Sequence, residues 1–403
     1  MSTYIARQPI LNKSQKIFGY ELLYRQTPQS PRYDGLDGDK ASSEIIMNSF
    51  HNVGIERVTS GKRAFINFTA KLIMDGVPTL LPNRVLVIEI LDSVQPNEEI
   101  IKACAKLRAK GYMLALDDFI MEPEYMPFLQ VADIVRVDFM NTPLNKIESF
   151  ARIMKDKPIK LLAERLETKE DFDTALAMGF SLFQGYFFCK PSVIISAEAD
   201  LSPLKVNCLS LIKYAFEPNV NFTKISDVIK HDVALSYRLL RVVNSAFFGL
   251  KYTVKNIRQA LAILGMEEVK KWVTLMSLSQ LSDDKPDELI RMSLIRAKFL
   301  ELLAPMAGMM RDADDLFMLG LISMMDAIVD LSFDEIVKRT NVSANIVEPI
   351  VTGQGKYADL LKIIRNYERS EWDEAFDACK SARIDPEKIS DVYLEAVQWA
   401  DQM

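Results

Sequence analysis

Hydrophobic and polar positions follow two different patterns along this chain, and the change falls near its middle. The first half contains short apolar runs rich in β-branched and aromatic residues, with stretches of helical spacing between many of them. These runs are Tyr4–Ala6, Phe18–Tyr24, Ala64–Phe68, Val85–Ile90, Met113–Leu116, Ile134–Val137, Leu161–Ala163 and Leu182–Phe188. Strands that alternate with helices predict a mainly parallel sheet, and a set of this size predicts a closed barrel.

Capping signals mark two of the helices between these runs. One helix is expected over Glu98–Lys110, because Asn97 is a suitable N-cap and Gly111 is a suitable stop. Another is expected after Thr168, where the sequence TKED can form a capping box. Both helices would connect consecutive strands, as the barrel interpretation requires.

Beyond residue 200 the strand signals fade and helical spacing takes over. Asp232–Asn244, for example, carries leucine and valine residues on one helical face. A chain of 403 residues is long enough for more than one domain. We therefore expect an α/β barrel over residues 1–199, followed by an all-α domain over residues 200–403.

Composition adds only broad limits. Hydrophobic residues make up 49% and charged residues 26%, as in ordinary soluble proteins. A net charge of -6 argues against direct nucleic-acid binding, which needs a basic surface. The four scattered cysteines suit a reducing compartment. No signal-peptide pattern is present, and no apolar run reaches the ~20 residues of a membrane helix. We expect a cytoplasmic protein that does not bind membranes.

Polar residues recur where the predicted strands end. Asn67 closes one strand, Glu89 the next, Asp117 and Asp118 a third, and Glu164 follows a fourth. Singly, an acid after a strand is often a helix N-cap. Several together indicate a rim site, because the carboxyl ends of barrel strands converge. Clustered carboxylates need a cation, and oxygen ligands suit Mg²⁺ or Mn²⁺. Two such ions could activate water toward a phosphodiester.

The first half contains, in this order, the motifs RQPILNKSQKIFGYELLYR, FINF, EILD, LALDDF, AERLET and FQGYFFCKP. Over residues 4–192 these motifs resemble the EAL family of cyclic-di-GMP phosphodiesterases, in which AERLET reads AEGVET. The resemblance implies a two-ion site for Mg²⁺ or Mn²⁺ with the ligands Glu21, Asn67, Glu89, Asp117, Asp118 and Glu164. It implies cyclic-di-GMP contacts by Gln8, Leu23, Arg25 and Gln184. The candidate catalytic residues are Glu21, Arg136, Glu164 and Glu167.

Two departures from the family pattern bear on catalysis. After LALDDF the family usually continues GTGYSSL, whereas residues 120–125 read IMEPEY and lack glycine. Arg136 stands where the family has a lysine beside the attacking water. Arginine keeps its proton at any ordinary pH, so it cannot simply act as a base. It could stabilise charge on a phosphate, or it could be a structural ion-pair partner of a nearby acid. The sequence leaves both roles open.

The second half contains the segment DVALSYRLLRVVNSAFFG, with an NSA-FFG turn over residues 244–249, and the later segment NYERSEW, which includes Tyr367. Over about residues 200–390 this half is similar to the HDOD family, which has the same turn and a similar C-terminal segment. His231 and Asp232 do not form a hydrolase metal pair, because the position for that pair reads GLISMMDA in this chain. We expect His231 to end a helix and the HDOD half to be non-catalytic.

Together the two resemblances imply cyclic-di-GMP signalling. The barrel would bind the dinucleotide with divalent metal, the HDOD domain would mediate protein interaction, and hydrolysis would be weak or absent. The alternative is an active metal-dependent phosphodiesterase that produces pGpG, so whether the chain is an enzyme stays open. A scaffold without ligand binding is disfavoured because every metal-site position is retained. The protein partner is not identified by the sequence, and a homodimer is left open.

Overall fold

The computed structural model describes residues 4–25, 55–119, 122–189, 203–217, 220–245, 253–281 and 285–402. The chain forms two compact units. The first contains Met1–Lys190 and Ile363–Met403, and the second contains Pro191–Lys362. Among the described residues, no helix has the length and apolar character that crossing a membrane requires. Part of the expected NSA-FFG turn, residues 246–249, lies outside the described residues.

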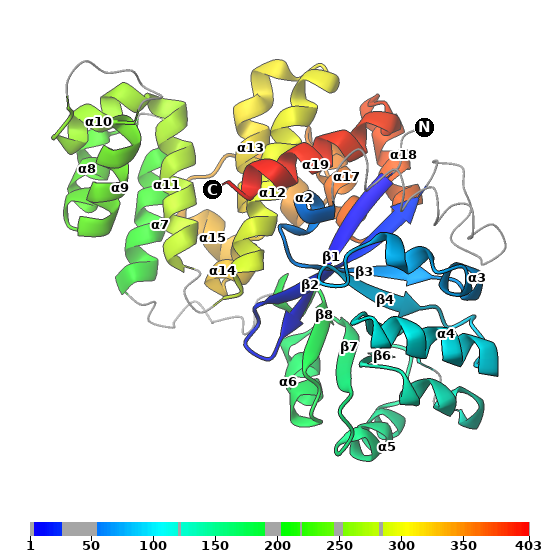
Figure 1. The fold of residues 1–403 in the computed structure, drawn as a ribbon. Helices are drawn as coiled ribbons and strands as arrows, with labels where there is room; N and C mark the ends of the chain where they lie inside the picture. Colours follow the sequence, from blue (N-terminus) through cyan, green and yellow to red (C-terminus); the bar gives the residue numbers. More distant parts are fainter. Residues whose placement is uncertain are drawn as a thin grey trace. The chain divides into compact units, whose positions relative to one another are not determined.

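Within the described part of the first unit, eight strands close into a barrel in chain order (Figure 1). They are β1 (Tyr4–Asn12), β2 (Ile17–Arg25), β3 (Arg63–Phe68), β4 (Leu86–Ile90), β5 (Met113–Leu116), β6 (Ile134–Asp138), β7 (Lys160–Leu166) and β8 (Leu182–Gly185). Strands β2 to β8 run parallel to one another. The predicted α/β barrel is confirmed. Strand β1 is antiparallel to both β2 and β8, which was not predicted.

A tight turn after β1 explains its reversed direction. The Asn12 side-chain oxygen accepts hydrogen bonds from the backbone N–H groups of Ser14 (2.9 Å) and Lys16 (3.0 Å). So short a connection can join only antiparallel strands, because parallel strands need a long crossover. The hairpin places Gln8 of β1 opposite Glu21 of β2.

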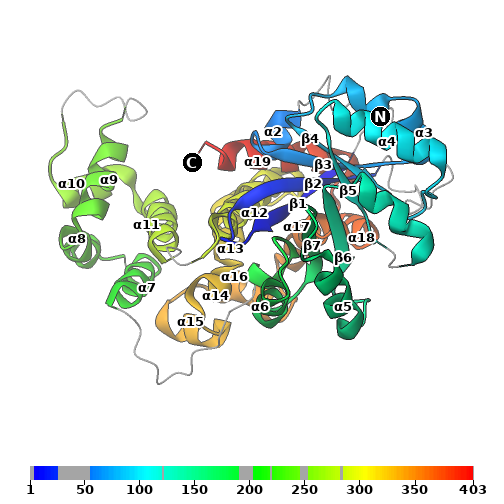
Figure 2. The same ribbon diagram turned by 60° about the horizontal axis from the view of Figure 1, so that its bottom comes forward.

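Helices connect the strands on the outside of the barrel (Figure 2). They are α2 (Ile55–Thr59), α3 (Ala70–Met74), α4 (Glu98–Ala109), α5 (Leu144–Met154) and α6 (Lys169–Ala177), with the 3₁₀ helices η2 (Val77–Leu80), η3 (Pro123–Gln130) and η4 (Phe187–Cys189). The predicted caps are confirmed. Asn97 accepts from the N–H of Ile100 at 2.9 Å, and Thr168 forms a capping box with Asp171. Each cap satisfies backbone donors that the first helical turn leaves unpaired.

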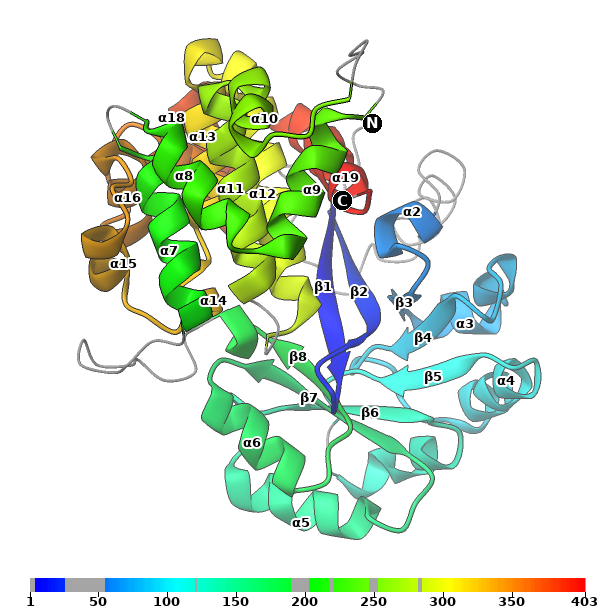
Figure 3. The same cartoon turned by 90° about the vertical axis from the view of Figure 1, so that its left-hand side faces the viewer.

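The C-terminal segment packs with the barrel unit rather than with the second unit. It comprises the end of α17 (Ala358–Glu368), α18 (Trp372–Ala382), η7 (Pro386–Lys388) and α19 (Ile389–Ala400). The buried Tyr367 hydroxyl donates to the Ile5 carbonyl of β1 at 2.9 Å. Helix α19 contacts β1 and lies beside one end of this strand in Figure 3. The compact units therefore divide the chain differently from the expected boundary, which assigned all of residues 200–403 to the second domain.

The second unit is helical throughout its described residues, which confirms the expected all-α class. Its helices are α7 (Pro203–Ala215), α8 (Phe222–Lys230), α9 (Val233–Val243), α10 (Ile257–Leu264), α11 (Met266–Leu281), α12 (Asp287–Met306), η6 (Met310–Asp312), α13 (Ala313–Ile322), α14 (Met325–Val329), α15 (Phe333–Arg339), α16 (Ala344–Val351) and the start of α17. His231 is the C-cap of α8, as expected. Asp232 is the N-cap of α9 and accepts from the N–H of Leu235 at 2.9 Å.

Candidate functional site

A layer of polar side chains lies directly above the apolar core of the barrel. The core contains one buried side chain from each of seven strands, namely Ile10, Phe65, Val87, Ala115, Ile134, Leu162 and Leu182. Side chains two positions apart in a strand point to the same face. In β3 to β8, the residue two positions after the core residue belongs to the polar layer, which consists of Asn67, Glu89, Asp117, Arg136, Glu164 and Gln184. In the reversed β1, the corresponding residue is two positions earlier and is Gln8.

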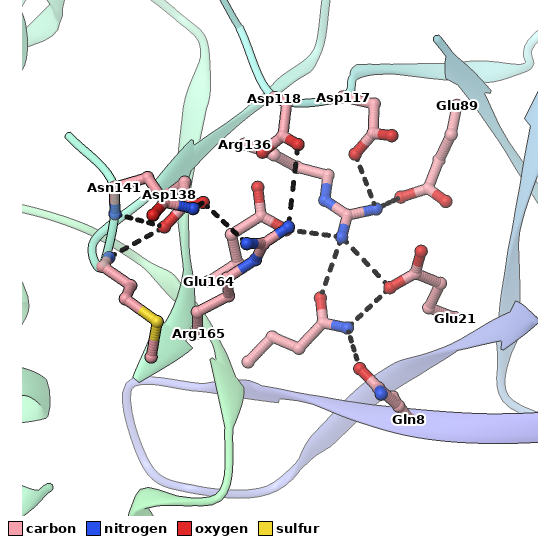
Figure 4. Close-up of polar contacts among 12 residues, drawn as sticks. Gln8, Glu21, Glu89, Asp117, Asp118, Arg136, Asp138, Asn141, Glu164 and Arg165 are labelled. Atoms are coloured by element: carbon pink, nitrogen blue, oxygen red, sulfur yellow. Dashed lines mark hydrogen bonds and ion pairs between the residues drawn. The ribbon is translucent and has the colours of Figure 1, made fainter. Parts of the chain in front are cut away.

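The guanidinium of Arg136 lies at the centre of this layer and contacts four acids (Figure 4). Its Nη2 donates to Glu21 Oε2 at 3.0 Å and to Glu164 Oε2 at 2.7 Å. Its Nη1 donates to Glu89 Oε1 and lies 3.2 Å from Asp117 Oδ1. The Arg136 residue is only 3% exposed. Of the two roles left open by the sequence, ion pairing with nearby acids is the one that the structure shows.

Gln184 of β8 connects the acid cluster to the N-terminal hairpin. Its amide Nε2 donates to Glu21 Oε2 at 2.6 Å and to Gln8 Oε1 at 3.0 Å. Its Oε1 accepts from Arg136 Nη2 at 3.3 Å. Two of the residues expected to contact a ligand, Gln8 and Gln184, therefore lie together beside two of the expected catalytic residues.

The remaining predicted residues are placed less centrally. Asn67 follows the same strand face and contributes a hydrogen bond to Glu21. Leu23 is half-buried in β2, and the Arg25 side chain lies outside the described residues. Glu167 precedes Thr168, the N-cap of α6, and its backbone N–H donates to Asp171 at 3.1 Å. It is not among the described contacts of the Arg136 side chain.

A second arginine, which was not predicted as a site residue, lies beside the polar layer. Arg165 Nη1 is 3.2 Å from Asp138 Oδ2, and its Nη2 is 3.9 Å from Asp118 Oδ2. Asp138 also accepts hydrogen bonds from the backbone N–H of Met140 and from both nitrogens of Asn141. The signal that could have identified Arg165 is AERLET itself, because the family motif AEGVET has glycine at this position.

Burial and the single guanidinium together determine how the acids ionise. Burial raises the pKa of Glu164 to about 8 and the pKa of Asp117 to about 6, although the charge of Arg136 opposes both shifts. Burial also holds the pKa of Glu89 well above its usual range. For Glu21, burial acts in the same direction, but the charge and hydrogen bonds of Arg136 outweigh it and lower the pKa. The Arg136 pKa is raised by the acids, so this guanidinium stays charged.

The expected metal ligands do not fit a divalent ion in this arrangement. Among the described residues, no group of three or more histidine, cysteine or acidic side chains is arranged to hold a metal ion. The carboxylates of Glu21, Glu89 and Glu164 face guanidinium nitrogens instead. A guanidinium has no lone pair with which to bind a metal, and its positive charge repels one. The two-ion expectation therefore has no support in the described geometry.

Comparisons with known proteins define the class of this chain. The EAL domain model matches residues 53–191, and the HDOD domain model matches residues 201–339. The uncharacterized protein YuxH of Bacillus subtilis is 33% identical over the whole chain and 99% of its own length. The cyclic di-GMP phosphodiesterase CdgJ of Vibrio cholerae is 33% identical over the whole chain and 93% of its own length. The chain belongs to the family of proteins in which an EAL domain precedes an HDOD domain.

Solved structures with EAL domains are more distant. The manganese and cyclic-di-GMP complex of Klebsiella pneumoniae BlrP1 is 21% identical, with a TM-score of 0.39, covering 47% of this chain and 55% of that one. The complex of Bacillus subtilis YkuI with cyclic-di-GMP and calcium is 18% identical, with a TM-score of 0.40, covering 59% of this chain and 72% of that one. Metal and dinucleotide are properties of those complexes.

Proposed function

We propose that this protein is a cyclic-di-GMP signalling protein whose barrel binds the dinucleotide at the polar rim and hydrolyses it weakly or not at all. Membership of the EAL family supports the ligand class. The rim also offers side chains suited to a polar ligand, since Gln8 and Gln184 lie side by side at the edge of the acid cluster. The proposed ligand contacts are those of Gln8, Leu23, Arg25 and Gln184.

The observation that carries the reduced hydrolysis is the central position of Arg136. Hydrolysis of a phosphodiester needs a water molecule that is both positioned and activated. Arginine cannot remove a proton from water, because it remains protonated at any ordinary pH. The carboxylates of Glu21 and Glu164, which could position water, accept hydrogen bonds from Arg136 instead. This geometry supports ligand binding more than turnover.

We assign the HDOD half the role of a protein-interaction module. The adjacent His231 and Asp232 of this half have structural roles here, since they cap consecutive helices. Asp232 also accepts from Gln280 Nε2 of α11 at 2.8 Å, so its carboxylate ties two helices together. A non-catalytic helical domain beside a nucleotide-binding barrel would report ligand binding to a protein partner.

The second candidate is an active phosphodiesterase that produces pGpG. It is favoured by one observation, namely that a relative 33% identical over the whole chain is named a cyclic di-GMP phosphodiesterase. In that case Arg136 would have to leave the carboxylates before catalysis. Both candidate functions have cyclic-di-GMP as the ligand, and they differ in whether the barrel hydrolyses it efficiently.

A binding assay and a turnover assay on the same preparations separate these functions. Fluorescently labelled cyclic-di-GMP is titrated into wild type, Gln184→Ala and Gln130→Ala, the last being an exposed control in η3. Unlabelled cyclic-di-GMP is then incubated with Mg²⁺ or Mn²⁺, and pGpG is resolved by chromatography beside an active EAL phosphodiesterase. We expect saturable binding that only Gln184→Ala weakens, with little pGpG. Turnover at the rate of the active enzyme would establish the second candidate, and lack of binding would refute both.

A further inference from the structure

Two arginines contact the acids that the EAL resemblance assigns to two metal ions. Arg136 contacts Glu21, Glu89, Asp117 and Glu164, and Arg165 lies beside Asp118. We propose that the guanidinium groups of Arg136 and Arg165 take the places of the two divalent ions, so that the barrel keeps its acidic rim without binding metal. This inference goes beyond the proposed function, because it concerns the acids alone and holds whether or not the ligand is cyclic-di-GMP.

The first step concerns charge. Four acids from β2, β4, β7 and the end of β5 converge on one buried point, and such a group is unstable without a cation. Arg136 reaches all four from β6, at N–O distances of 3.0 Å to Glu21, 2.7 Å to Glu164 and 3.2 Å to Asp117. A metal ion would place a positive charge among these carboxylate oxygens. In this chain the guanidinium of Arg136 provides that charge.

The second step explains why arginine suits this role. Its planar guanidinium carries five N–H donors in a fixed fork, whereas the ammonium of lysine is a single point charge with three donors. The Nη1 and Nη2 atoms of Arg136 contact different acids, two each. A lysine at this position could not contact acids on opposite sides of the layer in the same way.

The third step concerns Arg165, whose backbone conformation is one that favours glycine. Its φ angle is 57°, in the left-handed region where glycine is favoured, and the family motif has glycine here. A side chain in this region adds backbone strain. The Arg165 side chain lies in ion-pair contact with Asp138 and Asp118 in spite of that strain. Arg136 and Arg165, which both differ from the family motifs, therefore place positive charge beside the acids expected to bind metal.

The test measures metal binding directly. Full-length wild type, Arg136→Lys, Arg136→Ala and Arg136→Ala with Arg165→Gly are freed of metal with chelator and titrated with MnCl₂. Binding is followed by calorimetry and by the Mn²⁺ electron paramagnetic resonance signal, which broadens on binding. Thermal unfolding is recorded in chelator and in MnCl₂. Arg84→Ala serves as the control, because it removes an exposed arginine whose acid partner is also exposed.

We expect no saturable Mn²⁺ binding and no thermal shift for wild type and Arg84→Ala. Arg136→Ala should unfold at a lower temperature in chelator, recover stability in MnCl₂ and bind Mn²⁺ saturably, at least tenfold more tightly than the detection limit of the wild-type titration. Tenfold corresponds to about 1.4 kcal/mol of relieved charge repulsion. The double variant should bind a further ion. Stoichiometric Mn²⁺ binding by wild type would overturn the proposal. If Arg136→Ala does not fold, the wild-type titration still decides it.

Discussion

Arg136 Nη2 lies 2.7 Å from Glu164 Oε2, and the side chains are 4% and 7% exposed. The two residues come from neighbouring parallel strands, β6 and β7, whose register pairs Arg136 with Leu162 and Asp138 with Glu164. The Arg136 side chain therefore reaches diagonally across the two strands to Glu164, which lies two residues beyond its register partner Leu162. In a buried pair of this kind each group compensates the charge of the other. Removing one partner leaves an uncompensated buried charge, which destabilises the folded protein.

The first prediction follows from that compensation. Arg136→Met keeps much of the side-chain volume and removes the charge, so the acids around it lose their only described ion-pair partner at the centre of the layer. In metal-free buffer the free energy of unfolding of the barrel should fall by about 3–5 kcal/mol. Urea denaturation followed by circular dichroism measures this change. Arg84→Met, at an exposed pair with Glu56, should change stability by less than about 1 kcal/mol.

The second prediction concerns pH. Burial raises the pKa of Glu164 from its ordinary 4.5 to about 8, so the folded protein holds a proton that the unfolded chain releases between these values. Stability contributed by this proton is present below pH 4.5 and is lost as pH rises toward 8. The Glu164→Gln variant cannot lose the proton. Its stability relative to wild type should therefore increase from pH 5 to pH 8, as measured by urea midpoints. An unchanged difference across that range would contradict the raised pKa.

The barrel could be predicted from the sequence because its determinants are local. Each strand shows its apolar run, and the rim acids follow these runs at a fixed offset from the core residues. The caps at Asn97 and Thr168 were likewise readable from single residues. The reach of Arg136 could not be predicted, since it depends on which strands become neighbours and on the side-chain conformation that burial imposes. The sequence therefore indicated a cation for the acids and left open that Arg136 pairs with a nearby acid, without indicating that Arg136 contacts four of them.

The compact unit in which the C-terminal segment lies could not be predicted for a similar reason. Its helical spacing is the same whether it packs on the barrel or on the other helices. Periodicity shows which face of a helix is buried but not which element covers that face. Long-range contacts fix its position, among them the hydrogen bond from the Tyr367 hydroxyl to the Ile5 carbonyl. Aromatic contacts of Tyr367 with Trp372 and Tyr393, at 4.9 Å and 4.8 Å between ring centroids, hold the segment together.

The third prediction tests that contact. Tyr367→Phe keeps the aromatic packing but leaves the Ile5 carbonyl without its side-chain donor, which should reduce stability by about 1–3 kcal/mol. Hydrogen exchange should rise in β1 and in the hairpin to β2, because α19 and Tyr367 cover this part of the barrel. If exchange rises only in the second unit, the placement of the segment is wrong. A chain ending at Lys362 should show the same exposure more strongly.

The last prediction concerns Gly320, which lies in the segment GLISMMDA on α13. An alanine inside a helix is ordinarily about 1 kcal/mol more favourable than glycine, so helix propensity alone predicts that Gly320→Ala stabilises the protein. The packing predicts the opposite sign. An added Cβ would lie 2.4 Å from the backbone N of Ala297 and 2.4 Å from the carbonyl carbon of Arg296, both on α12. Backbone atoms cannot rotate away as a side chain can, so the two helices would have to separate. The expected result is destabilisation by about 1–3 kcal/mol, as for other overpacked interiors. Thermal unfolding of wild type and Gly320→Ala measures the sign, and a stabilised variant would show that α12 and α13 do not pack this closely.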